Sequence, residues 1–290
     1  MGSWTDATDL RREVGRAVLR PEHLEQQLVR ELLPAQGVLA TWVEHIWVLV
    51  WSVPVPPAST AIIPHPAVDL TLEGGPPGEV RHGHALPAAL LHGVPEGRFA
   101  PGLSAPGWVV GLHLRPGAVR DLTGTPAHVW TGHVVPWAQA WPEVGPRPGV
   151  ARRGPAGARR GAARAGLADD RKPRALRRRT ARAGGGAARP SRPEPVVRRG
   201  PGRPRVRLRA QLQRLCRDHL GVTPRWLLRR ARVLDAHELL STSDLDLAEI
   251  GAQLGWYDQS HLTRDDTAVT GVPPARVRRT RARDRAGRAS

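Results

Sequence analysis

The chain has a single cysteine, Cys216, among its 290 residues. One thiol excludes an internal disulfide framework and is typical of a protein kept in a reducing compartment. The N-terminus is polar and charged, so a secretory signal peptide is not expected. The most apolar run begins at Ile46, but it is short and interrupted by prolines, which argues against a membrane-spanning helix. We therefore expect a cytoplasmic protein without a membrane partner.

Residues 145–207 lack aromatic residues and isoleucine altogether and contain only two leucines. They carry 20 arginines and lysines against 3 acidic residues, so their net charge is +17 in a chain whose total is +18. Such a composition cannot bury enough apolar surface to offset the entropy of ordering, and it predicts a disordered segment. Three interpretations stay open: an arm that binds nucleic acids without sequence preference, a charged linker, or the product of a shifted reading frame.

Residues 1–144 have a different texture. They carry 9 arginines against 13 acidic residues, a net charge of −4, and eight of the ten tryptophans. Apolar residues three and four apart predict helices over residues 1–40. After these come short β-rich runs separated by proline and glycine, which predict a barrel- or sandwich-like β module. The larger hydrophobic core is therefore expected in this N-terminal part.

From residue 208 the pattern becomes helical and predicts an all-α module. Apolar residues of 208–220 share one face of a helix that Gly221 ends. A longer helix is expected over Pro224–Ser241, with Thr223 as its N-cap. Residues 208–290 carry 15 arginines against 10 acidic residues, a net charge of only +5. A claim of DNA binding for this part must therefore rest on geometry and not on net charge.

A helix-turn-helix outline follows. Residues 247–254 predict a short helix, and Gly255 allows a tight turn. Asp258 can cap the next helix, Gln259–Thr270, which Gly271 ends. In this motif the second helix lies in the major groove with its N-terminal residues at the base edges, where glutamine pairs with adenine, arginine with guanine, and serine or threonine with either. The residues placed there are Gln259, Ser260, His261, Thr263 and Arg264.

The segments "QLQRLCRDHLGVTPRWLLRRARVLDAHELL" and "LDLAEIGAQLGWYDQSHLTRDDTAVTGVPPARVRR" resemble the DNA-binding domain of the AraC/XylS family of bacterial transcription regulators. That resemblance implies two helix-turn-helix units joined by a long helix, with Gln213 and Arg214 reading bases in the first unit. "WVEHIWVL" and "HPAVDLTL" are similar to uncharacterised sensor domains that precede this module in some regulators. The resemblance implies double-stranded DNA and a small-molecule effector as partners, and it leaves a homodimer open.

Two departures from the family pattern predict an impaired protein. The run "RRGPGRPRVRLRA" before the first recognition helix is proline-rich and has no apolar period, so the first unit lacks its supporting helix. Its exposed core face would include Leu212, Leu215 and Cys216. Asp266 lies on the inward stripe of the second recognition helix, where an unpaired buried carboxylate costs several kcal/mol. We expect Asp266→Phe to stabilise this module.

The predicted fold is thus α+β, with an N-terminal sensor-like domain over 1–144, the basic segment 145–207, a helix-turn-helix domain over 208–280 and a basic tail over 281–290. Glu44, His45 and Asp69 flank apolar strand residues and could line a ligand pocket; the alternative, which the pattern favours, is that they are solvent-facing residues of half-buried strands. A cupin-like metal enzyme with His82, His84 and His113 as ligands is the alternative. It lacks the usual acidic ligand near the H-x-H pair, so no enzyme, cofactor or metal is expected.

Overall fold

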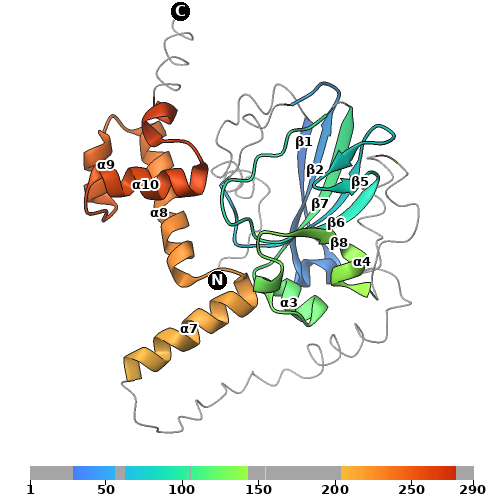
Figure 1. Cartoon of the computed structure of the whole chain (residues 1–290), viewed down its shortest axis with the longest axis horizontal. Coiled ribbons are helices and arrows are strands. Elements are labelled where there is room, and N and C mark those ends of the chain that lie inside the picture. The colour runs from blue at the N-terminus through green and yellow to red at the C-terminus, as the bar shows by residue number, and fades with distance from the viewer. Residues whose placement is uncertain (1–28, 56–62, 105, 143–153, 155–203, 279–290) are drawn as a thin grey trace, which may run out of the picture.

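The computed structural model describes residues 29–55, 63–104, 106–142, 154 and 204–278 (Figure 1). A β-rich N-terminal domain and an all-helical C-terminal domain confirm the expected α+β class. The strands are β1 Val29–Pro34, β2 Val43–Trp51, β3 Asp69–Gly74, β4 Val80–Arg81, β5 His84–Ala85, β6 Ala88–His92, β7 Gly107–Leu114 and β8 Val134–Pro136. The helices are η1 Gly37–Thr41, α3 Ala118–Thr123, η2 Ala127–Val129, α4 Trp137–Ala140, α7 Pro204–Leu220, α8 Pro224–Thr242, α9 Leu247–Gln253 and α10 Gln259–Thr270.

Six strands form one antiparallel sheet in the order β1-β2-β7-β3-β6-β8, and β4 and β5 form a separate hairpin. The central strand β7 is buried along almost its whole length, which is why its sequence is nearly continuous in apolar residues. One face of the sheet packs its leucines and valines against α3, η2 and α4. This face carries the larger core, so the concentration of tryptophans in the N-terminal part has a structural basis.

The expectation of helices over residues 1–40 is wrong for residues 29–34, whereas residues 37–41 form the short 3-10 helix η1. Val29–Pro34 is the edge strand β1, paired antiparallel with β2. Leu32 is buried against the core. Pairing with β2 satisfies the backbone and overrides the helical spacing of these residues, since local propensity is a weak prior. The rest of the expected helices, residues 1–28, lies outside the described residues, as do almost all of 145–203 and the tail 281–290.

The C-terminal domain follows the sequence-based helix bounds closely. Thr223 caps α8 by accepting a hydrogen bond from the backbone nitrogen of Trp226 at 3.2 Å. Gly271 ends α10 with a φ of 69°, the left-handed region that favours glycine. A compact core holds α8, α9 and α10 together, and Ile63 from the N-terminal domain joins it. Its buried residues are Ile63, Val233, Ala236, Leu240, Leu247, Ile250, Trp256, Leu262 and Val269.

The two domains touch where α7 turns into α8, beside α3 and η2 (Figure 1). Thr131 donates a hydrogen bond to the carbonyl oxygen of Gly221 at 2.7 Å. Asp218 accepts one from Arg120 at 3.3 Å, and Val222 is buried within the core of the N-terminal domain. The junction between the two helices is thus anchored on the sheet domain.

Candidate nucleic-acid interface

Local side chains explain why the C-terminal helix-turn-helix forms where it does. Asp246 and Glu249 make a capping box at α9: each carboxylate accepts from the other residue's backbone nitrogen, at 2.8 and 2.7 Å. Gly255 makes the turn with a φ of 78°. Asp258 caps α10 by accepting a hydrogen bond from the backbone nitrogen of His261 at 2.7 Å. The N-terminus of α10 is therefore held before any ligand arrives.

One side of α10 is fixed in the core of the domain. Leu262 is fully buried and Val269 nearly so, and both pack against α8 and α9. Trp256, in the turn before α10, is buried and donates its indole N–H to Asp265 at 3.0 Å. Arg229 of α8 pairs with the same carboxylate at 3.2 Å, so the charge of Asp265 is balanced within the protein. This packing fixes which side of α10 faces outward.

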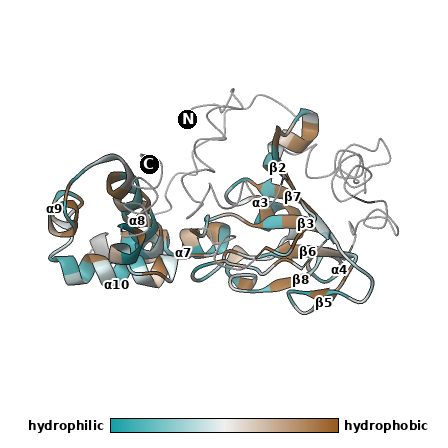
Figure 2. Ribbon diagram, turned by 90° about the horizontal axis from the view of Figure 1, so that it is seen from above, coloured by the Kyte–Doolittle hydropathy of each residue, from teal (hydrophilic) through white to brown (hydrophobic). Residues whose placement is uncertain are grey.

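The outward side of α10 is polar and open (Figure 2). It lines a surface hollow of about 700 Å³. The residues around the hollow are Gln259, Ser260, Thr263, Arg264, Thr267 and Ala268. Four of the five predicted base-reading residues therefore share one face. The fifth, His261, lies to the side, with its Nε2 3.5 Å from the carboxylate of Asp265.

Asp266 is fully buried, as the helical spacing predicts, but the expectation that its carboxylate is unpaired is wrong. Its Oδ1 accepts a hydrogen bond from Nε2 of His237 in α8 at 2.8 Å. Its Oδ2 lies 3.4 Å from the hydroxyl of Thr270. His237 is itself 5% exposed, so the pair is closed off from solvent. Asp266 therefore ties the second helix of the motif to the long helix α8, and it gives no reason to regard the motif as damaged.

The first unit presents only α7 within the described residues. Gln213 and Arg214 are exposed on it. Leu212 and Leu215 are each 49% exposed, as expected for a recognition helix without a supporting partner, whereas Cys216 is buried. The supporting helix would fall before Pro204, outside the described residues. The structure thus gives α7 an open polar side and an open apolar side.

A row of polar side chains crosses the second face of the sheet. His45 of β2 lies directly opposite His113 of β7, His113 opposite Asp69 of β3, and Asp69 opposite His92 of β6. A bulge between Val43 and His45 brings Glu44 near the row as well, with its Oε2 4.0 Å from Nε2 of His113. The residues proposed as ligand-binding, Glu44, His45 and Asp69, therefore converge on His113, which sequence reasoning had not grouped with them.

Within this row, the charged groups at pH 7 are His113 and Asp69. Nδ1 of His113 donates a hydrogen bond to Asp69 at 2.9 Å, and burial of His113 is outweighed by that carboxylate, so the pKa of His113 is raised. Burial would raise the pKa of Asp69, but the charge and hydrogen bond of His113 lower it to about 2. Burial, followed by repulsion from His113, lowers the pKa of His45 and of His65 to about 3. At pH 7 these two imidazoles are therefore neutral.

These pKa values predict that the N-terminal domain loses stability as pH falls from 7 to 5. His45, which is buried, and His65, which is half-buried, are neutral in the folded state and bind protons on unfolding below pH 6.5. This lowers stability by up to about 1.4 kcal/mol per pH unit for each, and by less for His65 because solvent screens it. His113 acts in the opposite direction near pH 7, because its raised pKa keeps it charged in the folded state while the unfolded state has mostly lost that proton. It therefore offsets part of the loss between pH 7 and about 6, and nothing below that. Urea unfolding followed by tryptophan fluorescence at pH 7 and 5 measures the difference.

His45→Phe serves as the matched variant, because it removes one titrating ring from a buried position. It should reduce the pH slope, while His133→Phe, at an exposed position, should leave it unchanged. Stability that is equal or higher at pH 5 than at pH 7 would contradict the assignment of neutral imidazoles.

The histidines of the cupin-like alternative do not converge. Nε2 of His84 lies 3.1 Å from the backbone oxygen of Val134, and His113 belongs to the polar row. Of these three histidines, His82 alone lies in a cluster with metal-ligand spacing among the described residues, and its neighbours there are Glu73 and His92. A signal for Glu73 was present in the sequence, because "DLTLEG" alternates Asp, Thr and Glu with leucine and glycine and so places all three polar residues on one strand face.

Among the described residues, no helix has the length and apolar character required to cross a membrane. Residues 208–280 match the family model described as a helix-turn-helix domain, and residues 30–136 match the model for a domain of unknown function, DUF6597. No curated protein matches the chain. A crystal structure of an apo ToxT lysine-to-alanine variant from Vibrio cholerae is 11% identical over 87% of this chain and 97% of that one, with a TM-score of 0.29, too low to carry an argument. The chain thus matches a DUF6597 domain followed by a helix-turn-helix domain, an arrangement that agrees with its resemblance to the AraC-type transcription regulators.

Proposed function

We propose that this regulator binds specific DNA sites through the outward face of α10 and that the N-terminal domain responds to a small effector. The observation that carries the proposal is the shared outward face of Gln259, Ser260, Thr263 and Arg264 on a capped helix whose other side is buried. Side chains of these types pair with base edges in the major groove. A helix held in advance loses little entropy on docking, which favours a defined register on the DNA.

The geometry of α8 supports a second contact through α7. Its 19 residues span ~28 Å at ~1.5 Å per residue. Major grooves on one side of a duplex recur every ~34 Å, so α8 is of the scale needed to separate two groove-binding helices. Gln213 and Arg214 are exposed on α7 and are the residues we assign to that contact.

For the effector, we infer that the polar row around His113 is part of the sensing surface. The apolar cavity beside Leu70 and Trp137 measures only about 10 Å³, room for about one water molecule, so a metabolite does not fit there. The polar row, by contrast, reaches toward α8: His65 lies 3.1 Å from His113, and the neighbouring carbonyl of Pro64 accepts a hydrogen bond from Arg230 of α8. A ligand that displaces His65 would therefore act directly on the helix between the two units.

The competing function is nonspecific nucleic-acid binding through residues 145–207. Both functions predict affinity that falls with salt, because both involve arginines and phosphates. Only the regulator predicts a preferred sequence. A binding site is first selected from random DNA with the full chain. Its dissociation constant is then compared with that of a scrambled fragment at two salt concentrations.

We expect the selected site to bind ~10³-fold or more tightly than the scrambled one at both salts. Equal affinity for the two fragments, with the same salt slope, would leave only the nonspecific function. Because such a regulator must reach chromosomal DNA, we place it in the cytoplasm. Both a monomer and a homodimer are compatible with the proposal.

A further inference from the structure

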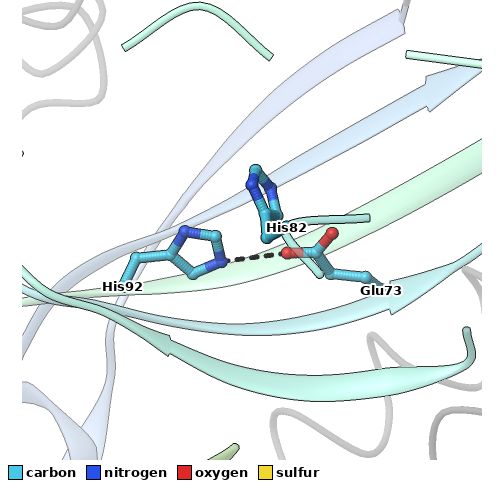
Figure 3. A group of neighbouring side chains, drawn as sticks. All are labelled: Glu73, His82 and His92. Carbon is cyan, nitrogen blue, oxygen red and sulfur yellow. Dashed lines mark hydrogen bonds and ion pairs between the residues drawn. The ribbon is translucent and has the colours of Figure 1, made fainter. Parts of the chain in front are cut away.

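Glu73, His82 and His92 bring three metal-ligand atoms together on the second face of the sheet (Figure 3). The three atoms, one from each side chain, lie within 4.8 Å of one another. Oε1 of Glu73 and Nε2 of His92 are 3.0 Å apart, and the rings of His82 and His92 are perpendicular with centroids 4.8 Å apart. Two ligands on a tetrahedral zinc ion are separated by roughly 3.3 Å, so small side-chain movements suffice to close the set around an ion.

The surroundings of Glu73 leave one of its oxygens directed at the two imidazoles. Arg81 holds the other oxygen, Oε2, at 3.1 Å, and Thr71 donates a hydrogen bond to Oε1 at 2.8 Å. Glu79 pairs with Arg81 at 2.9 Å, so the positive charge of Arg81 is shared between two carboxylates. The group therefore keeps one net negative charge for an incoming cation, and the ligand carboxylate is oriented by neighbours, as in established metal sites.

We propose that Glu73, His82 and His92 form a binding site for a divalent first-row transition metal ion in the sensor domain. Two imidazole nitrogens and one carboxylate oxygen suit Zn²⁺ and its neighbours, and they do not suit Mg²⁺ or Ca²⁺, which prefer oxygen ligands alone. The ion would replace the direct hydrogen bond between Nε2 of His92 and Oε1 of Glu73.

The backbone conformation at His82 is unfavourable for histidine, so the stability of the hairpin does not explain why a histidine occupies this position. His82 has a φ of 52°, and Gly83 follows with a φ of 81°, so both central residues of the two-residue turn between β4 and β5 are left-handed. Asparagine or glycine fits the first of these positions at lower cost than a histidine. Its imidazole has also lost solvent on folding. Both costs are explained if the side chain is needed as a ligand.

The cluster lies one short loop from the recognition helix. Phe99 packs against both imidazoles, with ring centroids 5.8 Å from His82 and 6.0 Å from His92. The preceding residue, Arg98, lies next to Gly271 at the end of α10, where an added Cβ would meet its side chain at 2.8 Å. An ion bound between the imidazoles would therefore lie beside the segment that contacts the DNA-binding domain.

Cobalt(II) is the probe, because its visible absorption reports the ligand set, and Zn²⁺ is then used to displace it. The full chain is stripped with a chelator and titrated. His82→Asn removes one ligand and suits the left-handed backbone, and His84→Asn in the same hairpin is the matched control. We expect one equivalent of cobalt to bind the unmodified chain and the control. His82→Asn should weaken cobalt binding by at least about 10-fold, because loss of even a residue that only supports a metal ligand costs about that much affinity.

Thermal unfolding of the metal-free proteins separates a ligand from a structural role. His82→Asn should melt at the same temperature as the unmodified chain or higher. The proposal is overturned if no saturable site appears, if His82→Asn binds cobalt as tightly as the unmodified chain, or if His84→Asn weakens binding equally. It is also overturned if metal-free His82→Asn unfolds at a clearly lower temperature. Each of these results is independent of whether the protein binds DNA.

Discussion

His237→Ala is expected to destabilise the C-terminal domain by about 3–5 kcal/mol, because it leaves the carboxylate of Asp266 fully buried without its imidazole partner. A domain is stable by only about 5–15 kcal/mol in total, so this loss removes a large share. The free energy of unfolding from urea titrations, followed by far-UV circular dichroism of the helices, measures it. DNA binding should fall in parallel, since the pair fixes α10 on α8.

Asp266→Phe tests the same pair from the other side. With an unpaired aspartate this substitution would raise stability, but with His237 present it removes a buried partner and forces a larger side chain into a packed site. We therefore expect a lower melting temperature for Asp266→Phe. The double variant Asp266→Leu/His237→Leu should recover most of the loss, because apolar replacement of a whole buried pair is often neutral or stabilising. An unchanged melting temperature in both single variants would contradict the pairing.

Arg264→Lys should reduce affinity for the selected DNA site by about 10-fold or more and leave affinity for scrambled DNA unchanged. Lysine keeps the positive charge but loses the planar fork that binds guanine in two places, and such a contact contributes about 1–3 kcal/mol of discrimination. Competition binding against both DNA fragments at constant salt measures the two affinities separately.

Gln259→Ala should have an effect of similar size at a different base pair, because Gln259 and Arg264 lie on the same open face of α10. Gln253→Ala is the matched control, since Gln253 is exposed at the end of α9 and not on that face. If Gln253→Ala and Gln259→Ala lost equal affinity for the selected site, α10 would not be the helix that reads the bases. Equal losses on selected and scrambled DNA in Arg264→Lys would reduce Arg264 to a phosphate contact.

Most of the C-terminal fold could be predicted because its signals are local. Caps and glycines such as Asp258 and Gly271 act on neighbouring residues, and the bounds of α10 agree with them. The strand β1 could not be predicted in this way, since its pairing with β2 depends on residues distant in sequence. The same limit applies to Ile63, whose place in the core of the C-terminal domain has no signal in the local sequence.

The candidate sites show the same division. Helical period predicted that Asp266 points inward, but its partner His237 lies 29 residues earlier on another helix. Likewise the H-x-H pair gave a cupin-like cluster of His82 with His84 as an alternative, whereas the structure directs His84 to Val134 and places His82 beside a carboxylate on β3. Side-chain direction within one element is readable from sequence, and contact between elements requires the register of the whole sheet.

The most direct measurement places a DNA-cleaving probe beside the N-terminus of α10. An iron chelate is attached to Tyr257→Cys, a position 94% exposed in the turn before the helix, with Cys216→Ala removing the native thiol. A second probe at His133→Cys, exposed on the N-terminal domain, is the control. We predict cleavage confined to a few nucleotides at one position of the selected site with the first probe alone. Diffuse cleavage, or the same pattern on scrambled DNA, would contradict the insertion of α10 into a major groove.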